Sequence, residues 1–380
     1  MSPASDSDRQ SLDTSKRVPP LPVELVQHIL EDVVTDAVDR GYQRTLARCC
    51  VVSKSFASLA VPLLFHHIRL RGRDLYSATL LSGSPRPTTL QHVRHLELVD
   101  LDLLPTAAGF DSESVLGLLQ HFTQLEIFEV EERPRSWELR ALLPDAIATW
   151  RMLKQLRLSH LTIDHAYLRH QPDLQVLQLH EFSSTSEVEC QVPFGLRQLT
   201  ISSHTEPRAF THLTRLSSST LTSLCLSIVT LDHFDLTPFH GIRDLRLSFP
   251  TRLPSIGYSE FDLAILLLRS VPHVTCLILD TEYDPPVSGQ FLVKKDFFNA
   301  LPPSLVELYL DAVPPPPPRY LANFLSSRDR LSQLERLACS YQASETASER
   351  AERLDNGALI AYKRPQLAFE WRNRRPWTDA

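Results

Sequence analysis

Residues 174–179 read Leu-Gln-Val-Leu-Gln-Leu, a phrase of the form apolar-x-x-Leu-x-apolar in which x is mostly polar. The phrase occurs ten times, and its copies begin at Val93, Leu125, Leu153, Leu174, Leu196, Leu221, Ile242, Val274, Leu305 and Leu334. The starts are separated by 32, 28, 21, 22, 25, 21, 32, 31 and 29 residues, and leucine holds the middle position in nine of the ten copies. One match would mean little at this apolar content, so the recurrence is what indicates a repeat.

Each phrase predicts a short β-strand whose leucines point to one side, because side chains alternate along a strand. No single repeat can bury its leucines, so neighbouring repeats are expected to stack and share a core. The longer gaps are predicted to hold helices at residues 112–122, 136–150, 260–271, 296–301 and 319–325. The predicted fold class is α/β, with an irregular repeat solenoid over residues 71–342. The alternative is a mixed α/β domain with unrelated short strands.

Residues 18–70 have a helical pattern instead. Apolar residues recur every three or four positions, at Leu21, Leu25, Val26, Ile29, Leu30 and Val33. Pro22 suits the first turn of that helix, and a third helix is expected from an N-cap at Ser53 to Pro62. Three short helices form only a small core, so this unit is expected to dock to a partner. Residues 1–17 are rich in Ser and Asp and are expected to be a disordered tail.

The composition argues against several functions. The net charge of -6 and the pI near 6.2 oppose general binding of nucleic acid. The longest apolar run, residues 264–268, is too short to cross a membrane, and residues 1–17 contain no apolar signal segment. The six cysteines are scattered without a CxxC pair, as expected for buried thiols in a reducing compartment. We expect an intracellular protein, cytoplasmic and/or nuclear, that binds neither nucleic acid nor a membrane.

Motifs that would carry catalysis are missing from the sequence. It contains no GxGxxG, P-loop, GxSxG or HExxH pattern. His66 and His67 are adjacent, so in a strand they would face opposite ways and share no metal easily. We predict no catalytic residue, no metal site and no cofactor, and we do not expect an enzyme.

Two parts of the chain resemble a known arrangement. Leu-Pro-Val-Glu-Leu-Val-Gln-His-Ile-Leu at residues 21–30, Val-Ser-Lys-Ser-Phe at 52–56 and Leu-Phe-His-His-Ile-Arg-Leu at 64–70 resemble an F-box. With the repeats, the chain is similar to fungal F-box proteins with degenerate leucine-rich repeats. The resemblance implies an F-box at residues 18–70 that binds the Skp-type adaptor and cullin core of an SCF ubiquitin ligase. The residues implied in the adaptor contact are Leu21, Pro22, Leu25, Ile29, Leu30, Val52, Lys54 and Phe56.

That resemblance implies a substrate-recognition adaptor, which holds a target protein near a charged ubiquitin-conjugating enzyme and supplies no nucleophile itself. The alternative is a protein-binding repeat scaffold that acts without a ubiquitin ligase. A third reading is a hydrolase with an unrecognised site, against which the missing motifs weigh.

The target is expected to bind the residues beside the second and third apolar positions of each phrase, which should point to the concave side. These candidates are Glu97, Glu129, Glu131, Arg157, Asp244, Arg246, Asp280, Glu307, Tyr309 and Asp311. Acidic residues gather toward both ends of the array, which predicts a target with basic patches. The alternative is that these charges only keep the array soluble.

Two further segments each have two possible interpretations. The five prolines at residues 314–318 are predicted to form a stiff connector; the alternative is a polyproline ligand for an SH3-type or profilin-like domain. Residues 343–380 are predicted to be a C-terminal capping segment or tail. In it, Trp371 and Trp377 would cover the last repeat, or the neighbouring arginines would contact nucleic acid or an acidic partner.

Overall fold

The computed structural model describes residues 22–35, 41–72, 87–99, 112–130, 137–183, 192–201, 207–227, 235–249, 260–281, 295–310, 325, 331–341, 357–358, 360 and 366–373. The chain divides into two compact units, Met1–His66 and His67–Ala380. We call them the helical unit and the repeat unit and describe each by itself. The predictions for residues 1–17, Leu21, Glu131, Asp311, the proline run and Trp377 lie outside the described residues.

The helical unit contains α1 (Val23–Thr35), α2 (Gly41–Cys50) and α3 (Lys54–Leu64). Its core is small and consists of Val26, Leu30, Leu46 and Ala60, with Phe56 and other half-buried side chains packed around it. Ser53 caps α3, since its side chain accepts a hydrogen bond from the Phe56 backbone N–H at 3.1 Å, as predicted for this serine.

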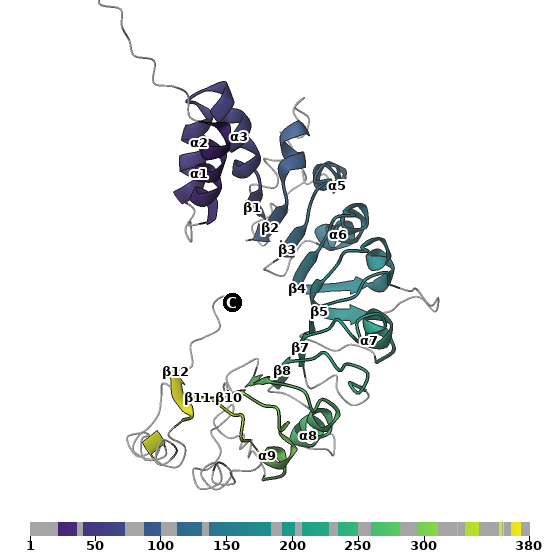
Figure 1. Cartoon of the computed structure of the whole chain (residues 1–380). Helices are drawn as coiled ribbons and strands as arrows, with labels where there is room; N and C mark the ends of the chain where they lie inside the picture. Colours follow the sequence, from purple (N-terminus) through teal and green to yellow (C-terminus); the bar gives the residue numbers. More distant parts are fainter. Residues whose placement is uncertain are drawn as a thin grey trace, which may run out of the picture. The chain divides into compact units, whose positions relative to one another are not determined.

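The repeat unit is built on one parallel sheet of twelve strands that lie in sequence order (Figure 1). The strands are β1 (His67–Arg71), β2 (His95–Val99), β3 (Ile127–Val130), β4 (Gln155–Asp164), β5 (Val176–Ser183), β6 (Gln198–Ile201), β7 (Ser223–Ser227), β8 (Asp244–Phe249), β9 (Cys276–Thr281), β10 (Glu307–Leu310), β11 (Arg336–Tyr341) and β12 (Ala368–Asn373). Each of the ten predicted phrases contains the start of one of the strands β2 to β11. The predicted α/β solenoid is confirmed.

Helices and 3-10 turns connect the strands, and in Figure 1 the helices labelled α5 to α9 lie on one face of the sheet. They are η1 (Pro87–His92), α5 (Ser112–Gln120), α6 (Trp137–Thr149), η3 (His165–His170), α7 (Pro207–Thr214), α8 (Glu260–Ser270) and α9 (Lys295–Ala300). The helices predicted at residues 112–122, 136–150, 260–271 and 296–301 are confirmed. The helix predicted at 319–325 lies outside the described residues except for Leu325, and α7, which begins at Pro207, was not predicted.

The core of the repeat unit is a stack of leucines held in register. The middle residue of each phrase is paired with the middle residue of the next, for example Leu177 with Leu199 and Leu245 with Leu277. Leu177 is 0% exposed and Leu245 1% exposed. Phe128 takes this position in β3, where its ring lies 4.7 Å from that of Trp150, whose indole N–H donates to the Leu119 carbonyl at 3.0 Å. The stacked core confirms the reading of the phrases as one array.

The array extends beyond the predicted boundaries of 71 and 342 at both ends. β1 pairs in register with β2, so residues 67–70 belong to the sheet and not to the helical unit. β12 pairs with β11, so part of the predicted cap is a twelfth strand. Both were missed because Ile68 and Phe369 hold the positions where the phrase requires leucine. No helix in the described part of the chain is long and apolar enough to cross a membrane.

Candidate partner-binding surfaces

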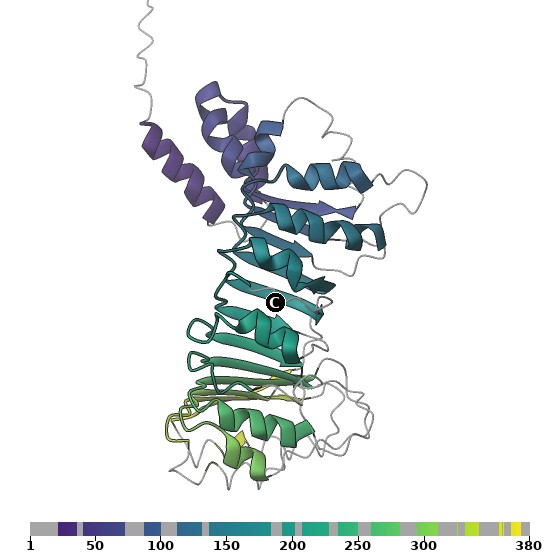
Figure 2. The same ribbon diagram turned by 90° about the vertical axis from the view of Figure 1, so that its right-hand side faces the viewer.

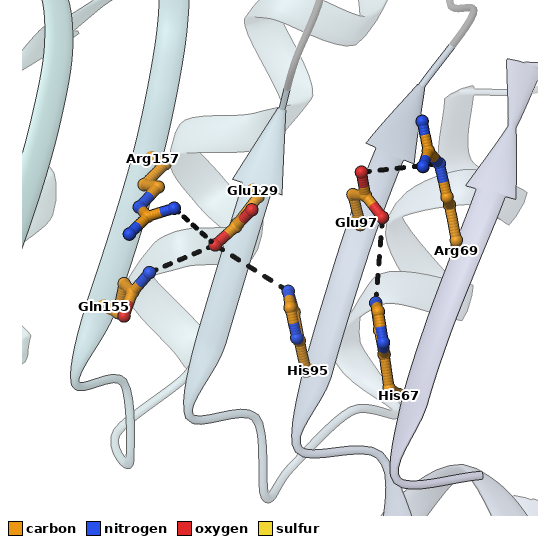
Figure 3. Close-up of polar contacts among 7 residues, drawn as sticks. All are labelled: His67, Arg69, His95, Glu97, Glu129, Gln155 and Arg157. Atoms are coloured by element: carbon orange, nitrogen blue, oxygen red, sulfur yellow. Dashed lines mark hydrogen bonds and ion pairs between the residues drawn. The ribbon is translucent and has the colours of Figure 1, made fainter. Parts of the chain in front are cut away.

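The strand residues that alternate with the buried leucines point to the face of the sheet opposite the helices, which we call the helix-free face. Neighbouring strands place these residues side by side in rows, because the pairing is parallel and in register. Figure 3 shows such rows on β1 to β4. Side chains that lie about thirty residues apart in the sequence therefore become direct neighbours.

At the start of the sheet, Glu97 lies between two residues of β1 (Figure 3). Its carboxylate is 3.4 Å from the Arg69 guanidinium and 3.7 Å from His67 Nε2. The His67 ring stacks on that of His95, with centroids 4.0 Å apart and planes 6° from parallel. The first two strands are thus joined by polar contacts as well as by backbone hydrogen bonds.

Glu129 occupies the equivalent position on β3 and lies next to three polar side chains (Figure 3). One carboxylate oxygen is 3.3 Å from Arg157, 3.8 Å from His95 Nε2, and accepts a hydrogen bond from Gln155 at 3.1 Å. The structure therefore brings three predicted site residues, Glu97, Glu129 and Arg157, into one cross-strand series of charges.

The C-terminal half of the face is organised in the same way. Arg246 forms an ion pair with Asp280, whose side chain is almost fully buried. Glu307 lies 3.0 Å from Arg336 and accepts a hydrogen bond from the Tyr309 hydroxyl at 2.8 Å, while Arg336 donates to that hydroxyl at 3.2 Å. Burial raises the pKa of Tyr309. Four predicted acids, including Glu97 and Glu129, thus lie next to an arginine, and the described part of the face carries ion pairs instead of one acidic field.

Asp244 and Cys276 lie in the same row as Glu307, on three adjacent strands. Loss of solvent around its carboxyl group raises the pKa of Asp244, and the nearby charge of Glu307 adds to this. Burial raises the pKa of the Cys276 thiol to about 11, and the charges of Asp244 and Glu307 act in the same direction. The thiol therefore stays protonated at neutral pH and is a poor nucleophile.

The helical unit offers a second candidate surface, which is apolar. Exposed apolar side chains lie on α1 and just after α2, at Val23 (57% exposed), Leu25 (46%), Ile29 (49%), Val51 (84%) and Val52 (67%). Of the other predicted adaptor contacts, Pro22 and Lys54 are exposed and Phe56 is half-buried. Leu30 is 3% exposed and lies in the core with Val26, so, contrary to the prediction, it has no surface to offer a partner.

The sequence alone did not single out Arg69, His95 or Gln155, which lie next to the predicted acids, and His67 was considered only as a metal ligand. The signal that could have found them is the register: once two phrases are aligned, opposite charges fall at the same position of adjacent strands. Among the described residues, no group of three or more His, Cys, Asp or Glu side chains is arranged to hold a metal ion.

No protein-family model and no curated protein matches the chain. Among solved structures, it is similar to the leucine-rich repeat-containing protein LegL7 from Legionella pneumophila, with 12% identity, 83% of this chain and 87% of that chain covered, and a TM-score of 0.34. It is also similar to TLR13 in its complex with ssRNA13, with 17% identity, 66% of this chain and 40% of that chain covered, and a TM-score of 0.32.

Because both TM-scores are low, the class of this protein rests on its own repeats. Twelve parallel strands in sequence order, ten of which carry the in-register leucine phrase, define an α/β solenoid of leucine-rich repeats.

Proposed function

We propose that this protein is the substrate-recognition adaptor of an SCF-type ubiquitin ligase, in which the helical unit binds a Skp-type adaptor and the repeat unit binds a target protein. The observation that carries the proposal is that α1 is apolar on two sides. One side, with Val26 and Leu30, fills the core of the helical unit. The other, with Leu25 and Ile29, is about half exposed. An exposed apolar surface on so small a unit supports docking to another protein.

The mechanism that follows is proximity. The helical unit would fix the chain to the cullin core through the Skp-type adaptor, and the repeat unit would hold a target so that its lysines meet a charged ubiquitin-conjugating enzyme. The protonated Cys276 thiol supplies no nucleophile to this step, since burial holds its pKa at about 11.

The proposal is tested by titrating the full chain with a purified Skp-type adaptor. Changing Leu25 and Ile29 together to aspartate should weaken binding at least about tenfold, because loss of an apolar anchor at an interface costs about 1–4 kcal/mol. Alanine at Leu21 and Pro22 should weaken it in the same direction. Both aspartates would lie on exposed positions, so circular dichroism melts should stay close to those of the parent chain.

Leu266 provides the matched control. It is 60% exposed on α8 in the repeat unit, so Leu266→Asp introduces the same kind of charge far from the proposed contact in sequence. This variant should bind the adaptor like the parent chain. No interaction between the parent chain and the adaptor would refute the ligase role and leave a repeat scaffold that binds its target without a ligase.

A further inference from the structure

The turns that lead into the strands form one edge of the repeat unit, visible in Figure 2 along the side where the strands begin. Backbone hydrogen bonds of 2.8 or 2.9 Å connect the residues just before β4 to β9 in one continuous row. Between β4 and β9 the row consists of Lys154, Gln175, Arg197, Thr222, Arg243 and Thr275. It continues to Glu126 and Arg94 on one side and to Val306, Glu335 and Ala368 on the other. Its cations therefore recur on every second strand, about 10 Å apart.

This edge is basic although the chain as a whole carries a net charge of -6. The described turn residues 151–154, 169–175, 192–197, 215–222, 235–243 and 269–275 contain seven exposed arginines and lysines, and two acids, Asp173 and Asp235. The seven cations are Arg151, Lys154, Arg169, Arg197, Arg215, Arg243 and Arg269. We call this set the basic turn edge.

Most of these cations are not neutralised by the fold. Within the described residues, Arg151, Arg197, Arg215 and Arg269 take part in no ion pair or side-chain hydrogen bond. Among the described residues, Lys154 is the one member of this set with an acidic partner, Glu126, at 2.7 Å. The contrast with the helix-free face is clear, since there Glu97, Glu129, Asp280 and Glu307 each lie next to an arginine. Within the described turns, the edge therefore carries more cations than acids, and four of its arginines have no ion pair.

A cavity of about 320 Å³ opens on this edge, between the turns that precede β8 and β9. Arg269, His240, His273 and Thr237 line it, and none of its lining residues is acidic. Asp235 lies next to it and accepts a hydrogen bond from the Thr237 backbone N–H at 2.9 Å. Ile242 and Val271, both buried, also line it and make part of its wall apolar. Arg243 donates to the His273 carbonyl at 2.9 Å and so ties the two turns together. The cavity can accept a carboxylate on a short aliphatic stem.

We propose that the basic turn edge binds an extended acidic segment of a partner protein, with one glutamate or aspartate side chain in the cavity beside Arg269. An extended chain advances about 3.3 Å per residue, so acids at every third position would meet cations about 10 Å apart. A peptide is favoured over a nucleic acid because the edge borders acidic groups of the sheet, such as Asp244, that would repel a wide polyanion. This site goes beyond the ligase role and would stand if the helical unit bound no adaptor.

The test uses the full chain and a fluorescent peptide of about nine residues with glutamate at every third position and Gly or Ser between, a length that spans about 30 Å when extended. Fluorescence anisotropy should show binding that weakens with salt. Arg197→Glu with Arg243→Glu should reduce the affinity at least about tenfold. Arg269→Gln should reduce it by several fold, while circular dichroism melts report that each variant is folded.

Arg44→Glu with Arg48→Glu is the matched control, since both arginines are exposed on α2 and the change in charge is identical. The affinity of this variant for the peptide should equal that of the parent chain within about twofold after correction for net charge. Equal loss in both double variants, or no binding of the peptide, would overturn the proposal. So would tighter binding of a single-stranded oligonucleotide with the same sensitivity to Arg197 and Arg243, which would make the edge a nucleic-acid surface.

Discussion

At the scale of single residues, the register of the sheet decides the chemistry of each charged group. Glu307 lies beside Arg336 and Cys276 because β9, β10 and β11 are paired in register. In sequence these residues are about thirty positions apart, so neither the ion pair nor the shift in the Cys276 pKa could be read from a local pattern. The same holds for His95, which stacks on His67 and lies beside Glu129.

Cys276 allows a prediction on reactivity and stability. Burial, with Asp244 and Glu307, raises its pKa from 9.0 to about 11. Between these two values the unfolded chain loses the thiol proton before the folded chain does. The contribution of this thiol to the free energy of unfolding is therefore fully present below pH 9 and is lost as the pH rises toward 11. At neutral pH the thiolate fraction should be about a hundredfold lower than in the unfolded chain.

Iodoacetamide labelling followed by peptide mass spectrometry measures this difference. Cys276 should react far more slowly in the folded chain than in urea, and Glu307→Gln should speed the reaction by removing a negative charge. Equal rates in the folded and unfolded chain would show that the thiol is not held protonated.

At the scale of the elements, one strand phrase per repeat contributes a leucine that no repeat could bury alone. Leu177 on β5 is enclosed because β4 and β6 place Leu156 and Leu199 beside it. The helices add the second layer, as Trp150 does after α6 by packing on Phe128. Each strand therefore depends on both of its neighbours, as expected for a solenoid.

Leu177→Ala should lower the free energy of unfolding by about 2–5 kcal/mol, because it opens a cavity in a fully packed position. Leu216 is 53% exposed in the turn before β7 and serves as the control. Its replacement by alanine should change stability by about 0.5 kcal/mol or less. Urea unfolding followed by circular dichroism gives both values, and similar losses for the two variants would contradict a shared leucine core.

At the scale of the whole molecule, two compact units carry two kinds of surface. The helical unit exposes apolar side chains at Leu25, Ile29 and Val52. The repeat unit presents paired charges on its helix-free face, and its turn edge carries arginines that form no ion pair with any described residue. The two surfaces suit two different partners, one bound by apolar contacts and one by charge. This division supports the proposal of an adaptor that brings two proteins together.

If the two units are separate in stability as well as in packing, a fragment of residues 67–380 should fold without the helical unit. We expect its circular dichroism melt to stay cooperative, with a midpoint within about 5 °C of the main transition of the full chain, since small changes shift large domains by only a few degrees. The fragment should keep its binding of the acidic peptide and lose that of the Skp-type adaptor. A fragment without a cooperative transition would show that the repeat unit needs the helices.

The sequence by itself determined the repeats, most helices and the composition of the core. In the phrase that starts at Leu174, alternation along the strand places Leu177 and Leu179 on the same side, and this does not depend on the neighbouring strands. The longer gaps between phrases gave the position of α5 and α8, and Ser53 marked the start of α3. These features depend on interactions between residues within a few positions of one another, and such local interactions can be predicted from the sequence.

Tertiary structure alone decided which side chains meet and which remain on the surface. Leu25 and Leu30 share one apolar pattern, yet only the packing of α2 and α3 against α1 leaves the first exposed and buries the second. β1 and β12 have weak phrases and become strands by pairing with an existing edge. Parallel pairing brings distant repeats to within about 5 Å of each other, a distance that no local pattern encodes. This pairing matches Glu129 with Arg157 and gathers the arginines of the turns on one edge.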